Sequence, residues 1–574
     1  MTPGEIVQAI LTGRGIIGDA AVREFLSDRP QLAYDPLLFE DMEAGASLLL
    51  AAVADGRRVC VYGDYDVDGV CGVALLCRYL RDVGDRLGTG GRERIQYYIP
   101  SRIEEGYGLN REALDVIRSG IAFEDGLPAD LVVTVDCGSV SAAEADYARE
   151  IGLEIIITDH HDLAEGLTPD CIFINPKRGG YPDSFLCGAA VAFKLCCAME
   201  EMREHDEGQE KADRGALLGL IDLVCIATIA DVMPLTGENR TLVKYGLGQI
   251  RRDRRPALKA LFRVAGLDAE TVSVRDIGFG IAPRINAAGR LSDAATAAEL
   301  FLTDDQARMQ EIAERIDLLN TERRGIQDEC FRECMALYEA ESEQAGAGPR
   351  FLMLKPAASH EGVSGIVAGK VREATGLPCA VLAETKDGDL KGSARSVGRL
   401  DLTSLLRGRA EYFFRLGGHA AAAGFSLHKE YEQRACEDLS SDLRTLIEAD
   451  PGLLDEETRI DLSVDASDIT PDLAEALGAL APFGHGNPPP ELAFWAPAGA
   501  IAFVKTMGAK GLHVRFQASG IPCVWFSGAA LLAALTSAPP GEQIEIIGCP
   551  EINVWNGRES LQLKVSVARL RGVV

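Results

Sequence analysis

Acidic and histidine residues recur directly behind short apolar runs in the first half of this 574-residue sequence. They are Asp64, Asp66 and Asp68 after RRVCVYG, Asp136 after LVVTV, and Asp159, His160 and His161 after LEIIIT. Each run is rich in Val and Ile and precedes a helix-like segment, which is typical of buried parallel strands. Because the carboxyl ends of parallel strands meet at one edge of an open sheet, we expect these side chains to converge.

The residue types of this set indicate a metal site. A further Asp, Asp231, stands in IADVMPL, and no Cys belongs to the set. Carboxylates and neutral imidazoles suit hard or borderline divalent ions such as Mg²⁺ and Mn²⁺. A single such Asp is commonly a turn or N-cap residue, and adjacent histidines can form a core pair, but four recurrences favour a two-metal hydrolase site. A calcium loop is disfavoured because Asp68 and Gly69 run straight into VCGVALLCRYL, with no closing Glu at the required offset.

Longer motifs surround these residues along most of the chain. They are GDYDVDG at 63–69, IPSRIEEGYGLN at 99–110, VTVDCG at 133–138, TDHHD at 158–162, IADVMPL at 229–235, PRINAAGRL at 283–291, HEGVSGIVA at 360–368, GSARS at 392–396 and GGHAAAAGF at 417–425. In order and spacing they resemble the motifs of the DHH phosphoesterase superfamily. Within it, the set resembles the RecJ family of single-strand-specific 5′→3′ DNA exonucleases, from about residue 35 onward.

The resemblance implies a role for each group of residues. Two ions, of Mn²⁺ or Mg²⁺, would be bound by Asp66, Asp68, Asp136, His160, His161 and Asp231. Asp64 and Asp159 would act as catalytic residues that orient those ligands, and His419 would stabilise the transition state. The DNA end and its neighbouring phosphates would be bound by Arg102, Arg284, Asn286, Arg290, His360, Ser393, Arg395, Gly417 and Gly418. Where many superfamily members have a metal-ligating histidine, this chain has Tyr62, which leaves the ligand count open.

Composition sets limits on where DNA can bind. The formal net charge of −29 is opposite to the basic excess of most nonspecific DNA-binding proteins, so a strand needs a local basic groove. One candidate is the run Arg251, Arg252, Asp253, Arg254 and Arg255. The alternative is that this run is simply an exposed loop or helix face.

The fifteen Cys residues are scattered, without a paired framework. With no apolar signal core and no run of about 18 apolar residues, we expect a cytoplasmic protein that does not enter a membrane.

The pattern of apolar runs predicts an α/β protein with several domains. We expect an N-terminal helical lead-in at 1–45, a doubly wound, mainly parallel DHH catalytic domain at 46–300, and a long connecting helix at 301–346. A second α/β domain, the DHH-associated domain, is expected at 347–455. Short alternating strands at 456–574 predict an antiparallel barrel, which the resemblance makes an OB-fold. Within it, Phe503, Phe516 and Trp525 are candidates for base stacking.

Two other functions compete with the exonuclease. One is a DHH phosphodiesterase of short oligoribonucleotides or cyclic dinucleotides, which the extra strands at 459–574 disfavour. The other is a replication scaffold without catalysis, which the intact acidic and histidine set disfavours. For the favoured function the expected partners are single-stranded DNA, a single-stranded-DNA-binding protein and a helicase, and the expected state is a monomer.

Overall fold

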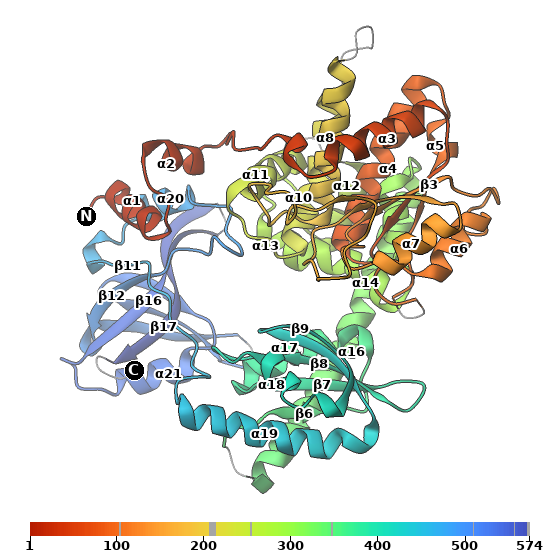
Figure 1. Ribbon diagram of the computed structural model, residues 1–574. Helices are drawn as coiled ribbons and strands as arrows, with labels where there is room; N and C mark the ends of the chain where they lie inside the picture. Colours follow the sequence, from red (N-terminus) through yellow and green to blue (C-terminus); the bar gives the residue numbers. More distant parts are fainter. Residues whose placement is uncertain are drawn as a thin grey trace. The chain divides into compact units, whose positions relative to one another are not determined.

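The computed structural model describes residues 1–574 except 103–104, 206–213, 253–254, 346–347, 509, 556 and 571–574. The chain divides into two compact units. The first unit combines residues 1–282 with residues 458–574, and the second comprises residues 283–457 (Figure 1). Among the described residues, no helix has both the length and the apolar composition that a membrane span requires.

A five-stranded parallel sheet lies at the centre of residues 46–282. Its strands are β1 (Val59–Gly63), β2 (Ile95–Tyr98), β3 (Leu131–Val135), β4 (Glu154–Thr158) and β5 (Ile172–Ile174), in the order β2-β1-β3-β4-β5. The direction of the strand order reverses between β1 and β3, and ligands of such sheets bind at this reversal. The predicted doubly wound parallel sheet is therefore confirmed.

Helices cover both faces of this sheet (Figure 1). On one face α6 (Arg111–Ser119) and α7 (Ala142–Glu150) pack on a core that includes Cys60, Tyr62 and Ile157. The other face and its outer layer carry η1 (Pro36–Leu38), α3 (Met42–Ala54), α4 (Val67–Leu87), α8 (Gly188–His205) and α10 (Ile221–Ala230). Further helical segments are α5 (Gly91–Arg94), α9 (Arg214–Leu218), α11 (Gly237–Arg252), α12 (Pro256–Ala265), α13 (Val274–Asp276) and the π-helical turn η2 (Ile277–Ile281).

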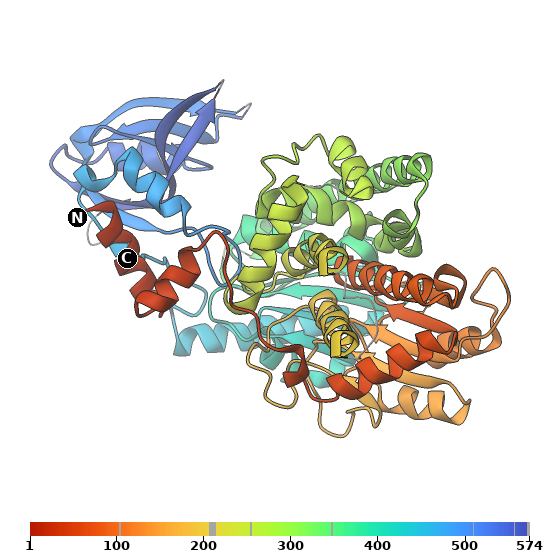
Figure 2. The ribbon, with the colours of Figure 1, turned by 90° about the horizontal axis from the view of Figure 1, so that it is seen from above.

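The N-terminal helix packs against residues 462–492 within the first unit (Figure 2). Helix α1 (Pro3–Gly13) buries Ile6, Ile10 and Leu11 against Leu473 and Leu477 of α20 (Pro471–Gly478). Helix α2 (Asp19–Leu26) follows, and a connecting segment without helix or strand leads from it to η1. The expected N-terminal lead-in is thus attached to the C-terminal part of the chain.

A seven-stranded, mainly antiparallel sheet forms the C-terminal part of the first unit. Its strands are β11 (Leu462–Ser463), β12 (Leu492–Pro497), β13 (Ile501–Met507), β14 (His513–Ala518), β15 (Ile521–Trp525), β16 (Gln543–Trp555) and β17 (Arg558–Leu570), with α21 (Ala529–Thr536) before β16 and the short turns η5 (Ala466–Asp468) and η6 (Ala498–Ala500). Phe516 and Trp525 are buried in its core, so their prediction as stacking residues is wrong. Phe503 is 79% exposed, as stacking requires.

The second unit contains a mixed sheet and the long helix. The helices are α14 (Ala282–Leu291), α15 (Ala295–Leu302), α16 (Gln306–Ala345), α17 (Glu361–Thr375), α18 (Leu402–Arg407) and α19 (Glu432–Ala449), with η3 (Ala410–Tyr412) and η4 (Lys429–Tyr431). The strands are β6 (Leu352–Leu354), β7 (Cys379–Glu384), β8 (Leu390–Arg395), β9 (Phe413–His419) and β10 (Ala422–Leu427), in the order β6-β7-β8-β10-β9. Helix α16 is about 60 Å long at 1.5 Å per residue. Its second half packs Cys330 and Cys334 into a core with α17, β6 and β7.

Candidate active site

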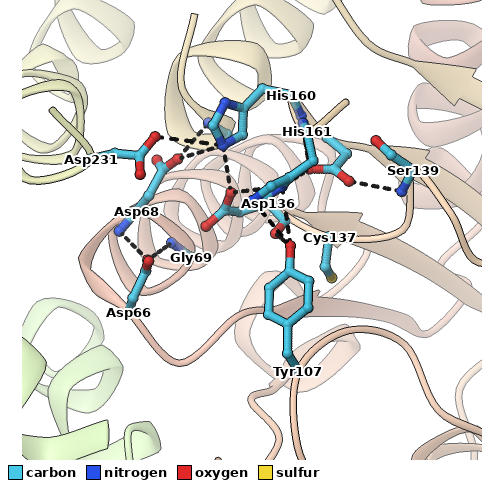
Figure 3. Close-up of polar contacts among 12 residues, drawn as sticks. Asp66, Asp68, Gly69, Tyr107, Asp136, Cys137, Ser139, His160, His161 and Asp231 are labelled. Carbon is cyan, nitrogen blue, oxygen red and sulfur yellow. Dashed lines mark hydrogen bonds and ion pairs between the residues drawn. The ribbon is translucent and has the colours of Figure 1, made fainter. Parts of the chain in front are cut away.

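Backbone amides orient the carboxylates that follow β1. Asp66 caps α4, because its Oδ1 accepts hydrogen bonds from the amides of Asp68 (2.8 Å) and Gly69 (3.2 Å). Gly69 must be small, since a Cβ there would lie 2.4 Å from the Asp64 carbonyl oxygen. The loop therefore holds Asp64, Asp66 and Asp68 within one tight turn (Figure 3 labels the last two).

The start of α8 fixes two carboxylates from different strands. The amides of Gly188 and Ala189 donate to Asp68 at 2.6 and 2.8 Å. Asp136, directly after β3, has a left-handed backbone with φ +64° and packs against Gly188, where a Cβ would lie 2.6 Å from the Asp136 Cβ. Gly188 was not among the predicted site residues. Its role depends on a contact between distant segments, for which the only local signal was a glycine at a helix start.

Asp159 acts as an anchor for the histidine pair. Its Oδ1 accepts from the His160 amide and from His161 Nδ1, both at 2.8 Å, while its Oδ2 accepts from the Ser139 amide at 2.8 Å. The side chain is buried. These bonds orient the His161 ring, which is the role predicted for Asp159. Ser139, which was not predicted, contributes to this anchor through its backbone.

His160 lies at the centre of the cluster (Figure 3). Its Nε2 is 3.0 Å from Asp136 Oδ1, 3.6 Å from Asp231 Oδ2 and 3.7 Å from Asp68 Oδ2. His161 Nδ1 is 3.9 Å from Asp136 Oδ1. All six predicted metal ligands, and the two residues predicted to orient them, therefore converge at the carboxyl ends of β1, β3 and β4 and at the end of α10.

The donor atoms form three overlapping groups that could each hold an ion. One group is Asp136, Asp159, His160 and His161, another is Asp68, His160 and Asp231, and the third is Asp64, Asp66 and Asp136. Asp136 and His160 each belong to two groups. The two carboxylate oxygens of Asp136 could serve two adjacent ions, whereas His160 Nε2, with a single lone pair, could serve only one.

Burial and mutual repulsion dominate the electrostatics of the cluster. Burial, together with the neighbouring carboxylates, raises the pKa of Asp64 and of Asp231 to about 8 and raises that of Asp136 well above its ordinary value. Burial lowers the pKa of His160. Burial alone would lower the pKa of His161, but its hydrogen bond to Asp159 and the charge of that carboxylate outweigh burial and raise the pKa to about 9. The crowded carboxylates thus repel one another, and a cation among them would relieve that repulsion.

Divalent cations fit this donor set. Four buried atoms of the cluster make no hydrogen bond with suitable geometry: Asp64 Oδ1, Asp136 Oδ1, His160 Nε2 and Asp231 Oδ2. Buried polar atoms nearly always have partners, so unsatisfied donor atoms gathered in one place indicate a site for a cation. Carboxylate oxygens suit both Mn²⁺ and Mg²⁺, and the imidazole nitrogens add donors of the kind that transition-metal ions take.

Two tyrosines near the cluster have different roles. Tyr62, for which the resemblance suggested a possible histidine position, is fully buried against Tyr98 on the α6–α7 side, and its hydroxyl donates to the Gly108 carbonyl at 2.9 Å. It therefore takes no part in the cluster. Tyr107, which was not predicted, places its hydroxyl 3.1 Å from His161 Nδ1 and donates to the Asp136 carbonyl at 3.4 Å. Its place in the IPSRIEEGYGLN motif was the available signal.

Among the described residues, few basic side chains lie near the cluster. The Arg102 guanidinium lies over the Tyr65 ring, 5.1 Å from its centroid, and its charge opposes the rise in the pKa of Asp64. In the predicted basic run, Arg255 pairs with buried Asp222 at 2.9 Å. Arg251 and Arg252 instead line a cavity of about 1720 Å³. Asp253 and Arg254 lie outside the described residues.

The second unit brings four predicted residues to one sheet face. In the β8-β10-β9 ladder, Arg395 is opposite Ala422 and Ala422 opposite His419, while Ser393, Gly424 and Gly417 form the next row on the same face. The opposite face carries the buried Ala394 and Ala423. His419 is exposed. The neighbouring strand β10 presents only the small residues Ala422, Gly424 and Ser426 on this face. Gly418, on the turn side, has φ +139°, and a Cβ there would lie 2.4 Å from the Ala422 carbonyl oxygen.

The remaining predicted DNA contacts make bonds within the second unit. Buried Arg284 donates to Asp317 of α16 at 2.8 Å, and Arg290 donates to the Gly362 carbonyl at 2.6 Å. His360 caps α17, its Nδ1 accepting from the Gly362 amide at 3.0 Å. Asn286 is half-buried on α14. Arg290 and His360 thus meet at the first turn of α17.

Comparison with known proteins agrees with this architecture. Residues 58–228 match the DHH family, N-terminal domain, residues 348–448 the DHHA1 domain, and residues 460–566 the RecJ OB domain. The single-stranded-DNA-specific exonuclease RecJ of Bacillus subtilis is 33% identical, over 98% of this chain and 68% of that protein. That of Escherichia coli is 33% identical, over 78% of this chain and 77% of that protein. The chain belongs to the RecJ family.

Solved RecJ structures share the fold as well. The crystal structure of RecJ in complex with Mn²⁺ from Thermus thermophilus aligns with a TM-score of 0.76 and 28% identity, covering 98% of this chain and 77% of that one. A structure of exonuclease RecJ bound to manganese aligns with a TM-score of 0.57 and 32% identity, covering 71% and 95%. The α/β fold, with a RecJ OB domain at its C-terminal end, is therefore confirmed.

Proposed function

We propose that this chain is a metal-dependent exonuclease that degrades single-stranded DNA from the 5′ end to mononucleotides, in DNA recombination and repair. The convergence of eight acidic and histidine side chains, at the ends of three strands and of α10, carries the proposal. Membership of the RecJ family, whose relatives are named as single-stranded-DNA-specific exonucleases, supports the substrate. The RecJ OB domain match at 460–566 favours long strands over short oligoribonucleotides or cyclic dinucleotides.

The proposed ligands are Asp66, Asp68, Asp136, His160, His161 and Asp231. Bound Mn²⁺ or Mg²⁺ would supply Lewis-acid activation of water and neutralise charge on the scissile phosphate. Bonds within the chain orient the proposed ligands, since α8 amides hold Asp68 and Asp159 holds His161. His160 stays neutral because burial lowers its pKa, so its Nε2 keeps a free lone pair. No side chain needs to act as a nucleophile.

The second unit would bind the DNA end. Ser393 and Arg395 are proposed to hold the 5′ phosphate, and His419, on the same sheet face, to stabilise charge that develops in the transition state. Gly417 and Gly418 allow a phosphate to approach the β9 backbone. Arg102, Arg284, Asn286, Arg290 and His360 are proposed to contact neighbouring nucleotides. From the family resemblance alone, we also propose a cytoplasmic monomer that works with a single-stranded-DNA-binding protein and a helicase.

End-labelled oligonucleotides test the function directly. With Mn²⁺, a 5′-labelled single strand should release its label at once as a mononucleotide, whereas a 3′-labelled strand should shorten progressively. A blunt duplex should resist, and a chelator should stop both reactions. Release of the 3′ label first, or equal degradation of the duplex, would contradict the proposal.

A further inference from the structure

A turn from the C-terminal part of the chain contacts the segment that follows Asp231. Asp231 ends α10, with its Oδ2 3.6 Å from His160 Nε2. Four residues later, the Leu235 amide donates to the His485 carbonyl at 2.7 Å. The turn is the PFGHGNP segment at 482–488, between α20 and β12, and it belongs to the same compact unit as Asp231. Its dense turn residues have no role in the function proposed above.

The backbone directly after Asp231 is strained. The Met233 amide donates to the Thr228 carbonyl and the Val232 amide to the Ile229 carbonyl, which is the hydrogen-bond pattern of a Schellman motif. Glycine usually occupies the left-handed position of that motif, but here it is Val232, with φ +57°. A β-branched residue persists in this conformation only where its surroundings impose it.

The turn packs its backbone on the residues that follow Val232. A Cβ on Gly484 would lie 2.7 Å from Leu235 Cδ1, and a Cβ on Gly486 would lie 2.9 Å from Pro234 Cβ. Gly486 also has φ +71°, a conformation that favours glycine. A larger residue at either position would push the turn away from Pro234 and Leu235.

The far side of the turn is anchored. Asn487 is 1% exposed, and its Nδ2 donates to the carbonyls of Leu480 and Pro482, both at 2.9 Å. Its Oδ1 accepts from Arg14, at the end of α1, at 2.6 Å. The buried amide of Asn487 therefore anchors one side of the turn. The other side packs against Pro234 and Leu235, in the segment that follows Asp231.

We propose that the 482–488 turn is a brace that positions Asp231 toward His160. The inference rests on the proposed function in that Asp231 serves as a metal ligand. Asn487 and Gly486 are then positioning residues, because they act through Pro234 and Leu235 and touch no reacting atom. His485 accepts the Leu235 bond through its backbone carbonyl, and its side chain is exposed, so the brace assigns no role to the imidazole.

Asn487→Ala in the full chain tests the brace, with His485→Ala as the matched control. Binding of Mn²⁺, followed by electron paramagnetic resonance, and hydrogen exchange of the 228–236 peptide in metal-free protein are independent of turnover. We expect Asn487→Ala to weaken Mn²⁺ binding about tenfold, as loss of outer supporting residues commonly does, and to speed exchange at Leu235. The kcat should fall while KM for a single strand stays nearly constant. His485→Ala should match the parent in every measurement.

Two further variants keep the test decisive. Gly486→Ala acts on Pro234 directly and should reproduce the Mn²⁺ loss, even where Asn487→Ala folds poorly. Val232→Gly in the Asn487→Ala background should restore Mn²⁺ affinity most of the way to the parent value, because glycine holds the left-handed conformation without strain.

Unchanged Mn²⁺ affinity and unchanged exchange at Leu235 in folded Asn487→Ala and Gly486→Ala proteins would overturn the brace. Loss of strand affinity with normal Mn²⁺ binding would also overturn it, because the turn would then serve the DNA. A parent chain that binds Mn²⁺ but leaves single strands intact would contradict the proposed function instead. The Mn²⁺ comparison among the variants would still test the brace in that case.

Discussion

Gly188 and Asp136 are in backbone contact, since a Cβ on the glycine would lie 2.8 Å from the Asp136 Cα. The same glycine donates its amide to Asp68 at 2.6 Å. Gly188 therefore sets the separation of two carboxylates, Asp68 and Asp136, which follow the different strands β1 and β3. The positions of two proposed metal ligands, Asp68 and Asp136, thus depend on the start of α8.

Gly188→Ala should lower turnover by about 100-fold, because a shift of about 1 Å in a catalytic constellation can cost that much. Most of the fold should survive, since the clash is confined to the Asp136 turn. Kinetics and thermal unfolding measure the two effects. Gly478→Ala is the control, because a Cβ at that α20 position meets nothing within 4 Å. Turnover near that of the control would show that Asp136 tolerates the shift.

Asp136→Asn should abolish strand degradation and yet stabilise the metal-free protein. Burial and four neighbouring carboxylates raise the pKa of Asp136, so an amide of the same shape removes a costly buried charge. Thermal unfolding in chelator should show a higher Tm than the parent. Added Mn²⁺ should raise the Tm of the parent more than that of the variant. A lower Tm in chelator would contradict the repulsion inferred for this cluster.

The metal-free protein should become less stable as the pH rises toward 8. The pKa is about 8 for Asp64 and Asp231 and about 9 for His161, and each lies above its unfolded value. A raised folded-state pKa gives stability that is complete below the unfolded pKa and is lost as the pH rises through the folded pKa. Mn²⁺ binds the deprotonated carboxylates and should flatten this dependence. Calorimetry between about pH 6 and pH 9, in chelator and in Mn²⁺, compares the two slopes, which should differ.

Arg395→Ala should abolish a preference for 5′-phosphorylated over 5′-hydroxyl strands. An arginine–phosphate contact is charge-assisted and bidentate. Its loss should therefore reduce the preference for the phosphorylated end more than it reduces the rate of hydrolysis. Competition between the two strands measures the preference. Arg399→Ala is the control, since Arg399 forms an exposed ion pair with Asp450. A preference that survives in Arg395→Ala would assign the 5′ phosphate to another residue.

The sequence predicted the parallel sheet and the convergence of the proposed ligands because both depend on local patterns in the sequence. Short Val- and Ile-rich runs with an Asp or His at the end suffice to place Asp136 and His160 at one sheet edge. The role of Gly188 depends on where α8 begins in space, which no local pattern records. The prediction that Phe516 and Trp525 stack on bases was wrong for a related reason. Alternation shows that two faces exist, but only the strand register decides that Phe516 and Trp525 face inward.

The packing of α1 on α20 has a consequence for how the protein is made. Ile6, Ile10 and Leu11 are synthesised before their partners Leu477, Leu480 and Leu492, which follow more than 460 residues later in the chain. At about 5–20 residues per second, the apolar face of α1 stays uncovered for roughly 25 to 100 seconds on every nascent chain. An apolar face that is exposed for so long favours aggregation of the unfinished chain, so the late α1–α20 packing makes synthesis the period in which this protein is most prone to associate wrongly.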